Sequence, residues 1–471
     1  SIQAELRAPS EISLTDLISL AKVILMARLF GTFGVRGVVN RELTPEIAFR
    51  LGLSMANYLG KGKKVAVGRD NRTSGEMFEH AVVAGLTAGG CDVLRLGLVP
   101  TPVLSFAIRH FSCDGGVIIT ASHNPPEYNG IKMWGADGAG FQRTQEEEIE
   151  RIYERGPEMV GWEYIGRVIA ADGISPYISA ALQKVEKFKK RWKVVVDCAN
   201  AVGSLVTPYL LRELGCEVIS MNSQLDGSFP GRKLEPVPEN LGELAKAVVA
   251  CGADLGIAHD GDADRTIVVD EKGRIISGDR VFAFAAMHYL RGKKSPKIIT
   301  TVATSLVLDE VARRLGGAVV RGRVGEPEIV GEWKRAGGDI GGEENGGVLF
   351  FDWTPGRDGI MTALQFMAEL DRHGGPVSEM NSSLPIFYQM KERVKCPHEM
   401  KQKVLEVLAE KFSRYQLNRT DGLRIDFDDG WLLLRPSGTE PLFRCFAEAR
   451  TEERARELVE MGMKELRECI G

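Results

Sequence analysis

The sequence predicts an α/β protein with three similar domains of mixed or parallel sheets and a smaller C-terminal α+β domain around one central cleft. Three observations support this fold class. Short apolar runs rich in valine and isoleucine alternate with helical patterns, which is typical of parallel sheets covered on both faces. The same strand–helix–strand–helix–strand order occurs three times, and alternating strands with separate helices follow it. A chain of 471 residues is also too long for one compact core.

Each of the three repeated units begins and ends with a predicted strand. The first unit has strands at 64–68, 92–96 and 116–121 and helices at 75–88 and 102–111. The second has strands at 193–197, 217–221 and 255–259 and helices at 205–214 and 241–251. The third has strands at 298–301, 318–321 and 339–341 and helices at 305–315 and 328–336. The repeat is one of structure and not of sequence, so it does not predict a solenoid.

The pattern changes after about residue 385. A helix at 400–412 precedes strands at 423–427, 431–435 and 443–449, and a closing helix begins at residue 452. Polar stretches at 146–161 and 272–279 are predicted seams between units. We therefore predict an N-terminal extension followed by four domains, with the bounds 1–25, 26–163, 164–272, 273–383 and 384–471.

Composition and charge exclude several classes of partner. Lys+Arg 60 against Asp+Glu 64 gives a net charge of -4, which favours neither nucleic acid nor a membrane surface as a partner. The 8 cysteines include no C-x-x-C pair, and several lie in apolar patterns, so we expect core thiols and a cytoplasmic protein. A homo-oligomer is compatible with this composition.

The first residues form a partly apolar segment. Residues 12–26 are too short and too charged to span a bilayer, and no basic leader or cleavage site indicates secretion. Apolar residues between 14 and 24 fall at helical spacing, so an amphipathic helix is one interpretation. The favoured interpretation is an upstream extension, with the working fold beginning near residue 26.

A polar loop follows the third strand of each unit. Ligands of open α/β sheets bind at the carboxyl ends of strands, so these loops are expected to share one cleft. In the first loop, Ser122 lies on a proline-stiffened turn beside His123, and Lys132 follows closely. A serine can act as a covalent relay when a neighbouring histidine or lysine moves protons. A capped turn before a helix explains this fragment about equally well.

The second loop carries alternating aspartates. Asp260, Asp262 and Asp264 offer three hard oxygen ligands, which suit Mg²⁺. A calcium EF-hand is excluded because Arg265 replaces the turn glycine and because the flanking segments are strands. A solvated acidic turn is the simpler alternative, although three neighbouring aspartates repel one another unless a cation compensates them.

Two further loops combine glycines with polar side chains. Glu343 and Asn345 lie between glycines, in a composition that suits sugar hydroxyls and also occurs in ordinary surface turns. Near the C-terminus, Arg435 is followed by Ser437, Gly438 and Thr439, a set suited to a phosphate dianion. Taken alone, this last fragment is explained slightly better by a hairpin turn.

Together these four loops resemble those of the α-D-phosphohexomutase superfamily, whose members move phosphate between the 1- and 6-positions of hexoses. The resemblance extends from about Leu29 to the end of the chain, with all four loops in the expected order and spacing. It implies a mutase that works through a phosphoserine and a hexose 1,6-bisphosphate intermediate. It also implies one Mg²⁺ per active site, a hexose 1,6-bisphosphate as activator, and hexose phosphates as substrates.

The resemblance implies a role for each residue of the loops. Ser122 would carry the phosphoryl group, with its oxygen completing a Mg²⁺ site made by Asp260, Asp262 and Asp264. His123 and Lys132 would transfer protons, while Arg36 and Arg265 would contact the reacting phosphoryl group. Glu343 and Asn345 would bind the sugar 3- and 4-hydroxyls. The other phosphate would be held by Arg435, Ser437, Gly438 and Thr439.

The sequence also departs from common family patterns. Position 33 is phenylalanine where many relatives have an acidic residue, and archaeal-type members look more like this chain. The sugar loop reads Glu-Glu-Asn-Gly-Gly, unlike the Met-Ser-Gly-His and Gln-Ser-Gly-His forms of bacterial relatives, and Glu326 lies where substrate contacts vary. We therefore expect a phosphomannomutase/phosphoglucomutase, with phosphoglucosamine mutase as the alternative. A non-catalytic paralogue that binds sugar phosphates is the alternative from another class, and the intact serine and aspartates argue against it.

Overall fold

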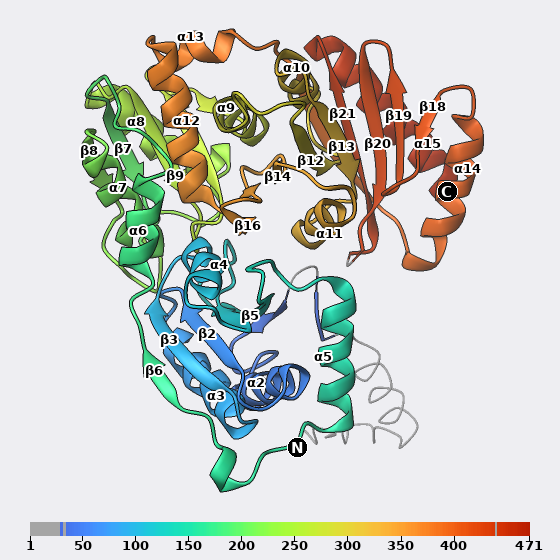
Figure 1. Cartoon of the computed structure of the whole chain (residues 1–471). Helices are drawn as coiled ribbons and strands as arrows, with labels where there is room; N and C mark the ends of the chain where they lie inside the picture. The colour runs from blue at the N-terminus through green and yellow to red at the C-terminus, as the bar shows by residue number, and fades with distance from the viewer. Residues whose placement is uncertain (1–28, 32–33, 439) are drawn as a thin grey trace, which may run out of the picture.

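A computed structural model describes residues 29–31, 34–438 and 440–471. The predicted N-terminal extension and the amphipathic pattern within it lie outside these residues, as does Thr439. Four sheets, one per domain, are arranged with the first domain below the second and third and the fourth domain beside the third (Figure 1). The predicted fold class, three similar mixed-sheet domains and a smaller α+β domain, is confirmed.

The first domain has a six-stranded sheet in the order β1-β5-β4-β2-β3-β6. Its strands are β1 (Val35–Val38), β2 (Lys64–Arg69), β3 (Asp92–Leu98), β4 (Gly115–Ile119), β5 (Tyr128–Gly135) and β6 (Val168–Ala170). Its helices are α2 (Pro45–Leu59), α3 (Gly75–Ala88), α4 (Thr101–His110) and α5 (Arg143–Arg155). Strands β2, β3, β4 and β6 run parallel, whereas β5 pairs antiparallel with both β4 and β1.

The second domain repeats this arrangement in the order β11-β10-β9-β7-β8. Its strands are β7 (Lys193–Asp197), β8 (Glu217–Met221), β9 (Leu255–His259), β10 (Thr266–Asp270) and β11 (Ile275–Ile276). Its helices are α6 (Ile174–Leu182), α7 (Thr207–Glu213) and α8 (Gly242–Ala250). Strand β10 is antiparallel to β9, as β5 is to β4.

The third domain has the order β13-β12-β14-β15-β16. Its strands are β12 (Lys297–Thr301), β13 (Ala318–Gly322), β14 (Ile340–Gly342), β15 (Val348–Phe350) and β16 (Thr354–Arg357). Its helices are α9 (Gly278–Tyr289), α10 (Val307–Arg314), α11 (Glu326–Ala336), α12 (Gly359–His373) and α13 (Val377–Ser382). Here too the third parallel strand, β14, turns back into an antiparallel strand, β15.

The fourth domain is an antiparallel sheet in the order β17-β21-β20-β19-β18 with helices packed on it. Its strands are β17 (Tyr388–Lys395), β18 (Gln416–Asn418), β19 (Leu423–Phe427), β20 (Gly430–Pro436) and β21 (Leu442–Ala449). Its helices are α14 (Lys401–Lys411) and α15 (Glu452–Ile470). Among the described residues, no helix combines the length and the apolar character needed to cross a membrane.

Two parts of the chain differ from the sequence expectations. The stretch that was expected to be a seam from residue 146 is mostly helix α5, because Gln142 and Gln145 cap its first turn reciprocally. Strands β6 and β11 lie beyond the predicted ends of the first two domains yet pair with the sheets of those domains. Both are short edge strands, which carry little periodic signal in sequence.

The buried core is continuous across the first three domains. One apolar cluster includes Val103 of α4, Leu210 of α7 and Phe366 of α12. The fourth domain has its own cluster around Leu432 and Leu458, and a small group containing Val302 and Trp431 joins it to the third domain. The first three domains are therefore one packed body, and the fourth is a separate one.

Candidate active site

The three loops expected to carry chemistry occupy equivalent places in the fold. Each connects the third parallel strand of its domain to the antiparallel strand that follows: β4 to β5, β9 to β10, and β14 to β15. This topology excludes the interpretation of the first loop as a capped turn before a helix, because β5 follows it. The carboxyl ends of β4, β9 and β14 thereby bring the loops toward one site.

Ser122 points at the aspartate loop. Its hydroxyl donates a hydrogen bond of 2.7 Å to Oδ2 of Asp260, although 138 residues separate the two. The serine is 2% exposed, and its backbone has a φ of 51°, in the left-handed region. The nearest imidazole nitrogen, Nδ1 of His123, lies 3.5 Å from the same hydroxyl. The structure thus places the serine oxygen against the acidic loop.

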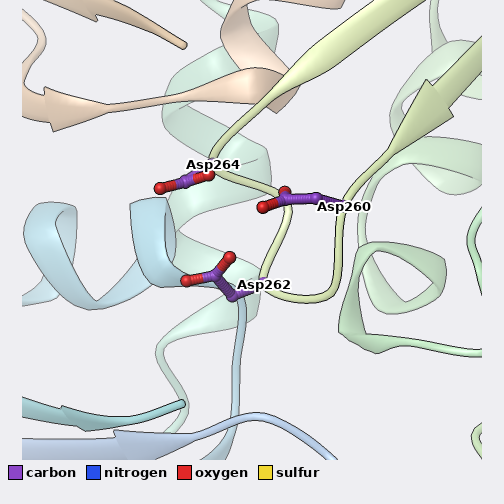
Figure 2. A group of neighbouring side chains, drawn as sticks. All are labelled: Asp260, Asp262 and Asp264. Carbon is purple, nitrogen blue, oxygen red and sulfur yellow. The ribbon is translucent and has the colours of Figure 1, made fainter. Parts of the chain in front are cut away.

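Asp260, Asp262 and Asp264 form a buried cluster that we call the metal triad. One carboxylate oxygen from each lies within 4.8 Å of the others, and Figure 2 shows the three side chains around a common space. Burial and the charges of Asp264 and Asp262 raise the pKa of Asp260 well above its ordinary value. Within the described part of the chain, Oδ1 of Asp262 and Oδ1 of Asp264 have no hydrogen-bond partner. Three clustered carboxylates, two of which have an oxygen without a hydrogen bond, fit Mg²⁺.

Gly261 and Ala263, the residues between the three aspartates, have steric roles that the sequence pattern did not show. A Cβ atom at Gly261 would overlap the carbonyl oxygen of Ser122, so only glycine lets the two loops approach this closely. Ala263 has a φ of 56°, a conformation that costs an alanine roughly 1 kcal/mol or more. The loop is therefore held in a specific shape, and its contact with Ser122 depends on that shape.

Basic groups surround the same space. Lys132, on β5, places Nζ 3.3 Å from Oδ2 of Asp262, and the lysine is 3% exposed. Arg265 Nε lies 3.7 Å from Asp264, and Arg36 contacts the side chain of Asn124. Burial, together with the neighbouring cations Arg265 and Arg36, lowers the pKa of His123 to about 3. The imidazole is therefore neutral at neutral pH.

Glu343 on the third loop is held at both carboxylate oxygens. Oε1 accepts a hydrogen bond of 2.9 Å from the backbone N–H of Gly325, and Oε2 contacts the guanidinium of Arg357. Arg357 also lies 3.5 Å from Glu326 and 3.8 Å from Asp264. This arginine, which the sequence interpretation missed, connects the third loop to the metal triad.

The phosphate-type loop of the fourth domain lies between β20 and β21. Arg435 Nε donates to Asp421 at 2.7 Å, and the same carboxylate oxygen accepts the N–H of Val324 in the third domain. Lys401 Nζ donates to the carbonyl oxygens of Ser437 and Glu440, both at 2.6 Å. Lys401 therefore holds the backbone of the loop, and Asp421 links Arg435 to the third domain.

One cavity of about 490 Å³ joins residues of all four domains. Eight of the predicted site residues line it: Arg36, Ser122, His123, Lys132, Asp264, Arg265, Glu343 and Asn345. Among the described residues of the fourth domain, Arg444 lines the cavity and Arg435, Ser437 and Gly438 do not. Arg444, on β21, is the cross-strand partner of Arg435 on β20, and the sequence motif did not identify it as a site residue.

Comparisons with known proteins agree with this arrangement. Models of the phosphoglucomutase/phosphomannomutase family match four successive parts of the chain: alpha/beta/alpha domain I at 27–159, domain II at 175–273, domain III at 277–387 and the C-terminal domain at 392–465. A phosphoglucomutase/phosphomannomutase of Thermococcus kodakarensis is 46% identical over 455 residues, covering 94% of this chain and 100% of that protein.

Two further relatives have similar coverage. A probable phosphoglucosamine mutase of Methanopyrus kandleri is 44% identical over 448 residues, covering 94% of this chain and 99% of that protein. The crystal structure of a phosphoglucomutase/phosphomannomutase family protein from Burkholderia thailandensis aligns with a TM-score of 0.86 at 28% identity, covering 94% of this chain and 97% of that one. The four matched domains and these relatives show that the chain belongs to the phosphoglucomutase/phosphomannomutase family.

Proposed function

We propose that this protein is a Mg²⁺-dependent phosphohexomutase that interconverts hexose 1-phosphates and hexose 6-phosphates through phospho-Ser122. The observation that carries the proposal is the serine hydroxyl 2.7 Å from Asp260 of the metal triad, in a cavity that four domains line. A serine buried against three carboxylates is poorly placed for hydrolysis in open water. It is well placed to hold a phosphoryl group whose charge a divalent cation neutralises.

The transfer balances in two steps. In the first, the bond between phosphorus and Oγ of phospho-Ser122 breaks while the free hydroxyl of the hexose phosphate bonds to phosphorus. The proton of the sugar hydroxyl is taken up by a proton-transfer residue, His123 or Lys132, and Oγ of Ser122 gains a proton in exchange. In the second, Oγ of Ser122 bonds to the phosphorus of the other phosphoryl group while the bond from that phosphorus to the sugar oxygen breaks, and the freed sugar oxygen takes up a proton in place of the one that Ser122 loses. Bound Mg²⁺ would be held by the metal triad and would supply charge neutralisation at the phosphoryl oxygens.

The surrounding side chains take distinct roles. His123 is neutral at neutral pH and accepts a proton or a hydrogen bond, while the amine of Lys132 lies 3.3 Å from Asp262 of the metal triad and can donate a proton. Arg36 and Arg265 line the cavity and stabilise the transferring group electrostatically. These groups provide positioning and charge, on which phosphoryl transfer mainly depends.

Sugar and phosphate binding are assigned to the third and fourth domains. Glu343 and Asn345 line the cavity with acceptor oxygens for sugar hydroxyls. Arg435 with Ser437, Gly438 and Thr439 would hold the non-reacting phosphate, and Arg444 extends this basic set into the cavity. Because the sugar must turn over between the two transfers, we expect the separately packed fourth domain to move.

The phosphoserine is tested by intact mass. Wild-type protein incubated with glucose 1,6-bisphosphate and Mg²⁺ should gain one phosphate, and Ser122→Ala should gain none and lose mutase turnover. Ser54→Ala is the matched control, since this buried hydroxyl donates only to a helix carbonyl of the same domain, that of Arg50. Turnover that persists in Ser122→Ala would overturn the proposal. An unphosphorylated but sugar-binding wild type would favour the non-catalytic alternative.

Magnesium binding is tested by thermal unfolding. A ligand at about 100 times its Kd adds about 2.7 kcal/mol of stability, so saturating Mg²⁺ should raise the Tm and EDTA should reverse the shift. Asp262→Asn should abolish most of this response. An equal response in wild type and variant would place the metal elsewhere.

The sugar preference has two candidates. We propose that mannose and glucose phosphates are the preferred substrates, supported by the 46% identical phosphoglucomutase/phosphomannomutase. A glucosamine phosphate is the alternative, supported by the 44% identical probable phosphoglucosamine mutase. Comparing kcat/KM for the three sugar 1-phosphates on one preparation decides between them. The highest value for glucosamine 1-phosphate would reverse the assignment.

A cytoplasmic location is proposed from the thiols. All eight cysteines lie within the described ranges and are free, which suits a reducing compartment. We expect the protein to bind hexose phosphates as substrates and a hexose 1,6-bisphosphate as activator in that compartment.

A further inference from the structure

The backbone of Ser122 needs a specific restraint. Its φ of 51° lies in the left-handed region, which residues with a Cβ avoid at a cost of about 1–3 kcal/mol. In that conformation its hydroxyl reaches Asp260 at 2.7 Å. If the backbone relaxed to a negative φ, the direction of the side chain would change and this contact would be lost. Something in the surrounding structure must therefore hold the strained peptide.

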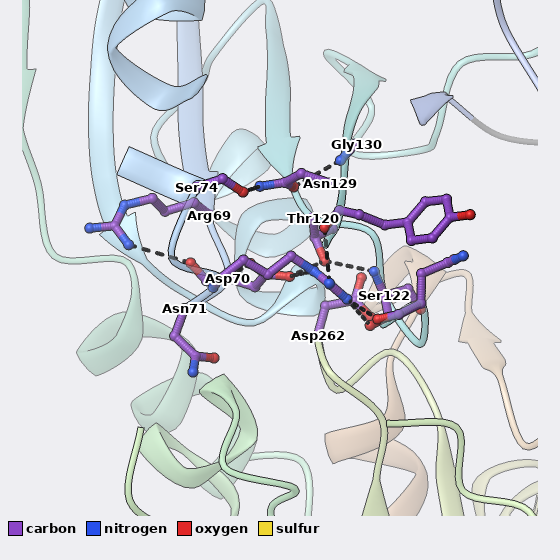
Figure 3. Close-up of polar contacts among 12 residues, drawn as sticks. Arg69, Asp70, Asn71, Ser74, Thr120, Ser122, Asn129, Gly130 and Asp262 are labelled. Carbon is purple, nitrogen blue, oxygen red and sulfur yellow. Dashed lines mark hydrogen bonds and ion pairs between the residues drawn. The ribbon is translucent and has the colours of Figure 1, made fainter. Parts of the chain in front are cut away.

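A closed ring of buried polar contacts surrounds this peptide, and Figure 3 labels three of its members, Asp70, Thr120 and Ser122. The N–H of Ser122 donates to Oγ1 of Thr120 at 2.9 Å, and that hydroxyl donates to Oδ2 of Asp70 at 2.6 Å. The carboxylate of Asp70 in turn accepts from the backbone N–H of Arg72 at 3.0 Å and from its Nε at 3.1 Å. The ring closes where Nη2 of Arg72 donates to the carbonyl oxygen of Ser122 at 3.0 Å. Both polar groups of the serine backbone are thus held.

Arg72 also holds the rest of the loop. Besides Ser122, its guanidinium donates to the carbonyl oxygens of Asn124 at 2.6 Å, Pro125 at 2.6 Å and Tyr128 at 3.0 Å. The side chains of Arg72 and Asp70 are both completely buried. A planar guanidinium can reach four carbonyls at once, which an amine cannot.

Neither Arg72 nor Thr120 lines the cavity that contains the hydroxyl of Ser122. Arg72 follows β2 and Thr120 follows β4, so the ring links two neighbouring strand ends behind the loop. Buried polar rings of this kind are rigid when every member is satisfied. Their contacts therefore act on the serine through its backbone, from residues that do not line the cavity.

We propose that Asp70, Arg72 and Thr120 are positioning residues for Ser122: their ring holds the serine peptide in the left-handed conformation that aims the hydroxyl at the metal triad. The inference rests on the proposed phosphoserine function and adds residues to it. None of the three touches the reacting atoms, so each acts through the backbone of Ser122.

The test uses Thr120→Val, which keeps the side-chain shape and removes the link between the N–H of Ser122 and Asp70. Phosphate incorporation from glucose 1,6-bisphosphate at saturation should fall roughly 100-fold, the effect of misplacing a reacting group by about 1 Å. KM for the hexose phosphate and the Mg²⁺-induced Tm shift should stay near wild type. Thr120→Ser, which keeps the hydroxyl, should recover most of the rate. Thr87→Val is the matched control, because this hydroxyl of the same domain bonds only helix carbonyls.

Arg72→Lys provides a second variant, since it keeps the charge but cannot serve all four carbonyls. A loss of kcat at constant KM in Thr120→Val and Arg72→Lys, with rescue by Thr120→Ser, supports the inference. Wild-type rates in Thr120→Val, or equal losses in Thr120→Ser and Thr120→Val, would overturn it. If wild-type protein itself takes up no phosphate, the proposed function fails instead, so the two failures are distinguishable.

Discussion

Arg357 should be a major source of stability in the third domain. Its guanidinium contacts Glu343 and lies 3.5 Å from Glu326 and 3.8 Å from Asp264. The side chain of Arg357 is 11% exposed and those of the three acids are each 4% exposed. Among the described residues, Arg357 is the one cation that contacts all three carboxylates. The substitution Arg357→Met removes this cation and keeps most of the apolar part of the side chain.

The magnitude follows from the distances. Opposite charges about 4 Å apart attract by about 4 kcal/mol at an effective dielectric constant of about 20, and the cost of desolvation offsets part of this. Removing one partner of a buried ion pair typically costs about 3–5 kcal/mol, because the remaining charge stays buried and unpaired. We therefore expect Arg357→Met to lower the free energy of unfolding of the packed body formed by the first three domains by about 3–5 kcal/mol at pH 7.5.

The pH dependence has a definite sign. Burial raises the pKa of Glu326, and Arg357 is the largest influence opposing that rise. Without Arg357 the pKa should rise further, so the folded protein binds protons that the unfolded chain has lost. A carboxyl group whose pKa is higher in the folded than in the unfolded protein lowers the free energy of unfolding as pH rises, and this destabilisation disappears as pH falls. The deficit of the variant should therefore shrink between pH 7.5 and pH 5.

Urea unfolding followed by tryptophan fluorescence measures this deficit, since Trp134, Trp192 and Trp353 all belong to the shared core of the first three domains. Arg313→Met is the control, because that exposed arginine pairs with Glu310 on the surface and should cost less than about 1 kcal/mol. A deficit in Arg357→Met as small as that of the control, or one that grows as pH falls, would refute the reasoning.

Two further substitutions have defined outcomes. Gly261→Ala should lower phosphate incorporation into Ser122 roughly 100-fold, because the new methyl group displaces the carbonyl of Ser122. An unchanged rate, measured by intact mass, would contradict the close contact between Gly261 and Ser122. Burial and the neighbouring charge of Glu448 raise the pKa of Asp279 to about 7, so this carboxyl lowers stability progressively as pH rises from about 4 through 7. Asp279→Asn should therefore show a flatter Tm profile than wild type between pH 5 and pH 8, and parallel profiles would count against it.

Local sequence patterns were enough to predict the repeated units. Strand β7 has the predicted bounds, and helix α3 does too, because buried parallel strands are short apolar runs that stand out from amphipathic helices. Strand β17 was missed, since it is mostly exposed and rich in charged residues. Helix α5 was taken for a seam because its charges hide its buried face. One of these residues, Glu146, is buried and accepts the N–H of Gly34, 112 residues away, a contact that local spacing does not show.

The site residues that the sequence predicted lie in short motifs, each visible from residues that are neighbours along the chain. The metal triad lies within one loop, and its type follows from the alternation of aspartates. Arg72 and Arg357 lie outside the four loops, and no local spacing shows that they contact Ser122 and Glu343. The partner of Arg435 was missed for the same reason, because Asp421 belongs to a different turn. Such pairs depend on how strand ends meet in three dimensions.

The equivalent placement of the three loops has an evolutionary consequence. Each loop is a hairpin connection on an otherwise self-sufficient sheet, so one can be altered without rebuilding the others. In the proposed function, the serine and the metal triad belong to the first two hairpins, while the candidate sugar contacts belong to the third. If Glu343 binds the sugar as proposed, substitutions near it can change the accepted carbohydrate without altering the first two hairpins, provided that Arg357 still connects the third hairpin to Asp264 of the second.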